Sequence, residues 1–160
     1  MKIKKILFVC LGNICRSPAA QGIMESYIKD SGMENSIYVD SAGTIAYHTG
    51  EEADPRMKTC ASNRGYELTH RARKFDPNKD FNDFDYIIVM DNDNYNDIKL
   101  LDKNDKYRNR IYKMAHFINK INVDAVPDPY YLAAEGFENV LDILEDGCST
   151  LLEKVKNEIG

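Results

Sequence analysis

The chain brings a thiol, an arginine and a hydroxyl close together in the segment Cys10–Ser17, which reads CLGNICRS. Backbone N–H groups of a tight loop and of a helix start favour an anion, and such surroundings lower the pKa of a cysteine thiol to roughly 4–7. The same groups bind a phosphate dianion, and the guanidinium of Arg16 can bind two of its oxygens. The hydroxyl of Ser17 can donate to a thiolate, and Gly12 allows a close approach of the backbone. The segment therefore predicts a phosphate-binding loop with Cys10 as nucleophile.

Other interpretations of this segment are weaker. A cysteine at a strand end is usually a small buried hydrophobic residue, and a CxxxxxR match alone is common by chance. Here the match lies between an apolar run, Lys4–Val9, and Ser17-Pro18, which is typical of a helix start. A nucleotide P-loop needs Gly-Lys followed by Ser or Thr, and the sequence has no such segment. The predicted anion-binding residues of the loop are Leu11, Gly12, Asn13, Ile14, Cys15 and Ser17.

A second requirement is a proton donor, because a leaving oxygen with a pKa near 10 departs poorly without one. Asp128, in the segment VPDPYY, is the best candidate: it lies between two prolines and before two tyrosines. Asp-Pro is also ordinary turn chemistry, and Asp91 competes for the role because it ends a predicted strand. The residues alone leave both aspartates open.

Apolar runs that alternate with helical patterns must position these groups. The predicted strands are Lys4–Val9, Ile37–Val39, Asp85–Met90 and Arg110–Met114. The predicted helices are Ser17–Lys29 with Ser17 near its cap, a second from Pro55 until Gly65, Tyr95–Leu101, and a long one from Phe137 to Ile159. The loops are Thr44–Asp54 and Asn122–Tyr131. We expect a doubly wound α/β fold: a four-stranded parallel sheet with helices on both faces, and the phosphate-binding loop after the first strand. Ligands bind at the carboxyl edge of such sheets.

Length and composition narrow the class of protein. The 160 residues predict a single domain, 1–160, that needs neither a disulfide nor a metal to fold. The net charge of −5 argues against nucleic acid or an anionic membrane surface as the main partner. Four cysteines without a CxxC pair, and three histidines, predict no metal site and reduced thiols in the cytoplasm. The apolar run near the start is too short for a signal peptide, and no stretch is long enough to span a membrane.

Several ordered motifs carry a resemblance to a known family: FVCLGNICRSP near the start, DSAGT from Asp40, His70 with Ala72-Arg73, FDYIIVMD, and DPYY from Asp128. Over nearly the whole chain the sequence resembles the low-molecular-weight protein tyrosine phosphatases. The resemblance implies that Cys10 forms a phosphocysteine, that Arg16 binds the phosphate and transition state, and that Asp128 is first acid and then base. It implies no cofactor, and as partner a phosphotyrosine-containing protein or a small aryl phosphate, with a monomer as the expected state.

The resemblance also implies the surroundings of the loop. Asn13, Ser17, Ser41 and His70 match the family's hydrogen-bond network that shapes it. Tyr47, Tyr130 and Tyr131 match the pocket walls, and an aromatic rim suits a flat phenyl ring. A deep cleft disfavours phosphoserine, whose side chain is short. Tyr47 stands where many relatives have tryptophan.

The resemblance gives Cys15 a redox role, because it matches a second family cysteine that can form a disulfide with the nucleophile and protect Cys10 from over-oxidation. Cys60 and Cys148 fall on predicted helices and are expected in the core.

Three alternatives remain. Arsenate reductases of this fold need relay cysteines, and Cys60 and Cys148 do not lie in the matching segment. Protein-arginine phosphatases carry threonine where this loop has Ile14, whose apolar side chain favours an aromatic substrate. A phosphate-binding module without turnover would usually lack Cys10, Arg16 or Asp128, and all three are present.

Overall fold

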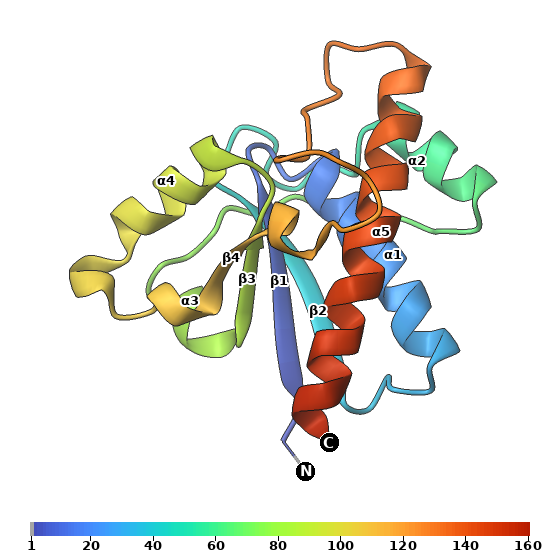
Figure 1. The fold of residues 1–160 in the computed structure, drawn as a ribbon. Coiled ribbons are helices and arrows are strands. Elements are labelled where there is room, and N and C mark those ends of the chain that lie inside the picture. Colours follow the sequence, from blue (N-terminus) through green and yellow to red (C-terminus); the bar gives the residue numbers. More distant parts are fainter. Residues whose placement is uncertain (1) are drawn as a thin grey trace.

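The computed structural model describes residues 2–160 and contains a four-stranded parallel sheet in the order β2-β1-β3-β4 (Figure 1). The strands are β1 (Lys4–Cys10), β2 (Ile37–Gly43), β3 (Tyr86–Val89) and β4 (Ile111–Lys113). The strand order reverses between β1 and β3, and in doubly wound sheets ligands bind outside the carboxyl ends of the strands at such a switch point. The predicted fold is confirmed.

Helices cover both faces of this sheet (Figure 1). They are α1 (Arg16–Asp30), α2 (Pro55–Asn63), α3 (Asp80–Asp83), α4 (Asn92–Leu101) and α5 (Ala134–Ile159), with short 3-10 helices η1 (Lys103–Asp105), η2 (Arg108–Arg110) and η3 (Met114–Phe117). No helix within residues 2–160 is long and apolar enough to cross a membrane.

The side chains of β1 alternate between two buried clusters, as expected of a strand with period two. Ile6 and Phe8 belong to the larger cluster, which α1, α2 and α5 complete. Leu7 and Val9 belong to the smaller one, which includes Phe81 of α3 and residues of α4. The central strand is therefore apolar on both faces, which explains why it reads as a continuous hydrophobic run.

The start of α1 differs from the prediction. The helix begins at Arg16 with Cys15 as the N-cap residue, and no side chain caps it. Ser17 is therefore inside the first turn, where its hydroxyl lies 2.9 Å from the sulfur of Cys10. Ser17 lies near the cap, as predicted, but its hydroxyl does not cap the helix because it contacts the loop that precedes the helix instead.

Other boundaries shifted for local reasons. The helix α4 begins three residues before the predicted Tyr95, because Asp91 accepts a hydrogen bond from the backbone N–H of Asn94 at 2.8 Å and caps it. The strand β2 extends beyond the predicted Val39 to Gly43, which pairs with Cys10 in register. The helix α3 was not predicted, since four residues are too few to show a helical period.

Candidate active site

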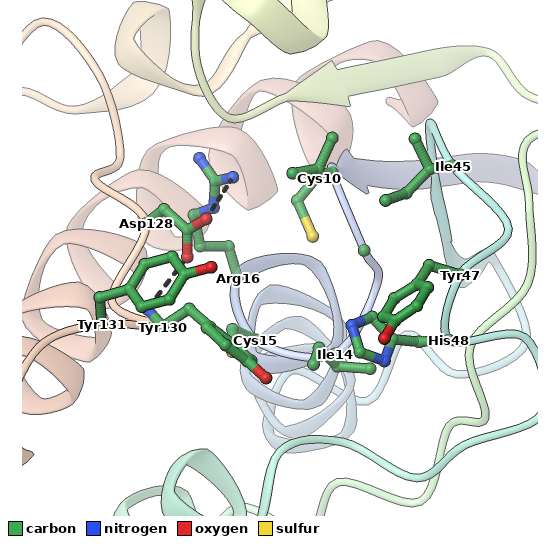
Figure 2. Close-up of a pocket in the computed structure, with 12 residues that line it drawn as sticks. Cys10, Ile14, Cys15, Arg16, Ile45, Tyr47, His48, Asp128, Tyr130 and Tyr131 are labelled. Carbon is green, nitrogen blue, oxygen red and sulfur yellow. Dashed lines mark hydrogen bonds and ion pairs between the residues drawn. The ribbon is translucent and has the colours of Figure 1, made fainter.

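A cavity of about 330 Å³ lies at the loop that connects the end of β1 to the start of α1 (Figure 2). Its lining residues are Cys10, Leu11, Gly12, Ile14, Cys15, Arg16, Ile45, Tyr47, His48, Asp128, Tyr130 and Tyr131. The side chain of Cys10 lies between one wall with Tyr130 and Tyr131 and another with Tyr47 and His48 (Figure 2). The fold thus brings the predicted nucleophile, arginine, aspartate and tyrosines together.

Asn13 belongs to the loop that forms the floor of this cavity, and its backbone has a left-handed conformation, with φ of 59°. The backbone N–H of Arg73 donates to its Oδ1 at 3.0 Å, so the amide nitrogen faces the other way. That nitrogen donates to the hydroxyl oxygens of Ser17 at 2.8 Å and of Ser41 at 3.0 Å. The Ser17 oxygen also lies 2.9 Å from the sulfur of Cys10, and once that sulfur is a thiolate only the Ser17 hydroxyl can donate between them. The network therefore supplies a donor to a thiolate.

Ser41 and His70 support Asn13 from outside the loop. The hydroxyl of Ser41 donates to Oε1 of Gln21 at 2.7 Å, and Nε2 of His70 lies 2.8 Å from Oδ1 of Asn13, so it must donate. The other ring nitrogen lies 3.3 Å from a carboxylate oxygen of Asp40. Burial lowers the pKa of His70, and Asp40 opposes that effect. Gln21 was missed by sequence reasoning, because a polar residue inside a helical pattern has no distinguishing signal.

Arg16 is almost completely buried, with 3% of its side chain exposed. Its Nη1 donates to Oδ2 of Asp91 at 2.6 Å and to the carbonyl of Val126 at 3.1 Å, while Nη2 lies 3.8 Å from Oδ2 of Asp128. Burial alone would lower the pKa of this guanidinium, but Cys10 and Asp91 raise it above its usual value. A permanent, oriented positive charge therefore lies beside the sulfur.

The two competing aspartates have different surroundings. One carboxylate oxygen of Asp91 pairs with Arg16 and the other caps α4. Asp128 lines the cavity, with 43% of its side chain exposed, and its Oδ1 accepts the backbone N–H of Tyr130 at 3.1 Å. Both oxygens of Asp91 accept hydrogen bonds from the protein, whereas Oδ2 of Asp128 lies 3.8 Å from Nη2 of Arg16 without a hydrogen bond and is available to a bound molecule.

The wall opposite Asp128 contains two residues that sequence reasoning missed, Ile45 and His48. The ring of His48 lies 4.7 Å from that of Tyr47 and rests on Gly12, where a Cβ would meet its Cδ2 at 3.0 Å. Both residues belong to a loop without a regular period, so only the fold shows that they face the cavity. Tyr47 itself is 79% exposed, and its position at the rim agrees with the prediction.

The cysteines have distinct environments. Cys15 lines the cavity but is 4% exposed, and burial together with the charge of Asp54 raises the pKa of its thiol well above the usual range. Cys60 and Cys148 are buried in α2 and α5, as expected of core residues. Across residues 2–160, no cluster of histidine, cysteine and acidic side chains could hold a metal ion.

Comparison with known proteins agrees with this geometry. The profile of the family described as "Low molecular weight phosphotyrosine protein phosphatase" matches residues 5–159. A Synechocystis protein provisionally named a low molecular weight protein-tyrosine-phosphatase is 46% identical over 97% of this chain and 98% of its own length. The low molecular weight phosphotyrosine protein phosphatase of Gallus gallus is 35% identical over 96% of each chain.

A solved structure gives the same assignment. The crystal structure of a protein tyrosine phosphatase from Entamoeba histolytica, with Hepes in its active site, superimposes with a TM-score of 0.93. It is 43% identical and covers 98% of this chain and 99% of its own. The chain therefore belongs to the low molecular weight phosphotyrosine protein phosphatase family and is a hydrolase of that class.

Proposed function

We propose that this phosphatase hydrolyses phosphotyrosine in two steps through Cys10. In the first step the thiolate attacks phosphorus, an S–P bond forms, and the P–O bond to the phenol breaks while Asp128 gives its proton to the departing oxygen. In the second step the Asp128 carboxylate takes a proton from water, which attacks phosphorus. The S–P bond then breaks, and inorganic phosphate and the Cys10 thiolate are released.

The observation that carries this proposal is the position of the Ser17 hydroxyl. Its oxygen accepts from Asn13 and lies 2.9 Å from the sulfur of Cys10, so the hydroxyl is the donor whenever that sulfur is a thiolate. A hydrogen bond to a charged partner stabilises it by about 1.5–3 kcal/mol. The bond favours the thiolate both as the starting nucleophile and as the leaving group of the second step.

Arg16 and the loop supply the electrostatic part. The guanidinium is held in place by Asp91 and Val126, so it need not reorganise when a phosphoryl group arrives. Its Nη2 lies 3.8 Å from Asp128, which places the positive charge and the acid on the same side of the cavity. This arrangement supports Arg16 as the group that binds the phosphoryl oxygens and Asp91 as its support.

The walls favour a phosphate on an aromatic ring. Tyr47, Tyr130 and Tyr131 surround the mouth, and Ile14 and Ile45 add apolar surface. Such a cleft matches the faces of a phenyl ring. We infer that the substrate is a phosphotyrosine-containing protein or a small aryl phosphate.

The test is steady-state turnover of matched phosphotyrosine, phosphoserine and phosphoarginine peptides, with Cys10→Ser as control. We expect turnover of the phosphotyrosine peptide only, and Cys10→Ser should abolish it while vanadate still binds. Substantial turnover by Cys10→Ser would refute the nucleophile, and preference for phosphoarginine would refute the substrate class. A protein that binds vanadate but turns over no peptide would instead be a phosphate-binding module.

A further inference from the structure

Arg56, the second residue of α2, is outside the cavity lining but is tied to the phosphate-binding loop. Its backbone N–H, Nε and Nη2 donate to the carboxylate of Asp54 at 2.8, 3.0 and 2.8 Å. Asp54 is 6% exposed, and its backbone N–H donates to the carbonyl of Ile14 at 2.8 Å. The plane of the guanidinium is therefore set by a segment that is hydrogen-bonded to the loop.

The same guanidinium contacts the segment that carries Asp128. Its central carbon lies 5.3 Å from the ring centre of Tyr130 and 4.7 Å from that of Phe137 in the first turn of α5. A guanidinium over an aromatic face is attracted by the ring quadrupole. Because the backbone N–H of Tyr130 donates to Asp128, a displacement of that tyrosine also displaces the carboxylate.

We propose that Arg56 is a positioning residue for proton transfer, which holds the segment 128–131 against the support of the phosphate-binding loop. Tyr130 is the point of contact on that segment. A second attachment lies at Leu132, which packs so closely on Gly136 of α5 that a Cβ there would be 2.5 Å away. Arg16 lies 3.8 Å from Asp128 itself, and Arg56 adds a contact two residues further along the segment, next to Tyr131, which is 91% exposed.

The positioning role requires the planar guanidinium of Arg56 and not merely its positive charge. Two nitrogens of Arg56 bind the two oxygens of Asp54, which leaves the flat face of the group for the aromatic rings. A lysine could keep the charge but could neither bind both oxygens in one plane nor stack. The proposal rests on the proposed role of Asp128 as general acid.

The experiment compares Arg56→Met and Arg56→Lys on phenyl phosphate and p-nitrophenyl phosphate, whose leaving groups are poor and good. A misplaced acid slows departure of the leaving group only where that group needs a proton, and kcat/KM reports the steps up to that departure. We therefore expect Arg56→Met to lower kcat/KM about tenfold for phenyl phosphate and less than about twofold for p-nitrophenyl phosphate. Arg56→Lys should resemble Arg56→Met. Arg108→Met, an exposed arginine on η2, is the matched control and should match the unmodified enzyme on both substrates.

Burst titration of the phosphocysteine corrects each rate for the fraction of folded enzyme, so lost stability is not counted as lost catalysis. Equal losses of kcat/KM on both substrates, or full activity of Arg56→Lys, would overturn the proposal. The variant Asp128→Ala separates the positioning role of Arg56 from the proposed function. If Asp128→Ala shows no leaving-group dependence, the assignment of Asp128 as the acid fails. If Asp128→Ala shows this dependence and Arg56→Met does not, only the positioning role of Arg56 fails. Adding Arg56→Met to Asp128→Ala should cause no further selective loss.

Discussion

Asn13 offers the sharpest test of the site, because its amide makes four hydrogen bonds while its backbone is left-handed. We expect Asn13→Ala to remove the contacts to Arg73, His70, Ser17 and Ser41 and to strain the backbone at φ of 59°. Asn13→Gly removes the same contacts without the strain, since glycine adopts positive φ freely. The pair therefore separates the hydrogen bonds from the conformation.

The structure gives the magnitude for each variant. A buried donor left without an acceptor, here the N–H of Arg73, costs about 1–3 kcal/mol, and the other bonds contribute about 0.5–1.5 kcal/mol each. A left-handed alanine adds about 1–2 kcal/mol. We expect the free energy of unfolding to fall by about 3.5 kcal/mol or more in Asn13→Ala, and by about 1–2 kcal/mol less in Asn13→Gly.

The catalytic effect follows from the Ser17 proton. Without Asn13 the Ser17 oxygen loses the donor that fixes its position, and loss of the charge-assisted bond from Ser17 to the Cys10 thiolate, about 1.5–3 kcal/mol, lowers kcat about 10- to 100-fold. Ser17→Ala should show the same loss of kcat with a smaller loss of stability. Because both changes remove one interaction, Asn13→Gly combined with Ser17→Ala should lower kcat no further.

Urea unfolding supplies the stabilities, and turnover of p-nitrophenyl phosphate supplies kcat. The proposed contribution of Asn13 to catalysis is refuted if Asn13→Gly folds and keeps kcat within about threefold of the unmodified enzyme. It also fails if the double variant loses the product of the two single effects, since Asn13 and Ser17 would then act independently. Equal stabilities of the alanine and glycine variants would show that the backbone is not left-handed there.

Two further predictions concern packing and pH. Gly43→Ala should lower the free energy of unfolding by about 1–3 kcal/mol and raise KM, because its Cβ would lie 2.8 Å from the carbonyl of Leu11, and urea unfolding with kinetics checks both. The hydrogen bonds from Arg56 lower the pKa of Asp54, so its stabilisation is present above the unfolded pKa near 3.9 and is lost as pH falls through the lower folded value. Asp54→Asn should therefore be less stable than the unmodified protein at pH 7 and approach it in acid; a constant difference in urea unfolding across this range would refute the ion pair.

Local sequence was enough to predict the features whose residues lie close together along the chain. The thiol, the arginine and the hydroxyl of the Cys10–Ser17 segment lie within one strand-to-helix connection, so their meeting requires no distant contact. The apolar positions of α5 recur at helical spacing because one face of the helix is buried. The apolar positions of β1 form an unbroken run because both faces of the strand are buried. The fold class follows from the order of these elements.

Only the tertiary structure distinguishes side chains that share an edge of the sheet. The residues alone leave Asp91 and Asp128 both open as the acid, yet Asp91 binds Arg16 and caps α4 whereas Asp128 faces the cavity. Ser17 lies near the helix cap, but its hydroxyl contacts Asn13 and Cys10 instead of capping the helix. These outcomes depend on hydrogen-bond partners from separate segments, and a local pattern carries no information about which distant group will meet a given side chain.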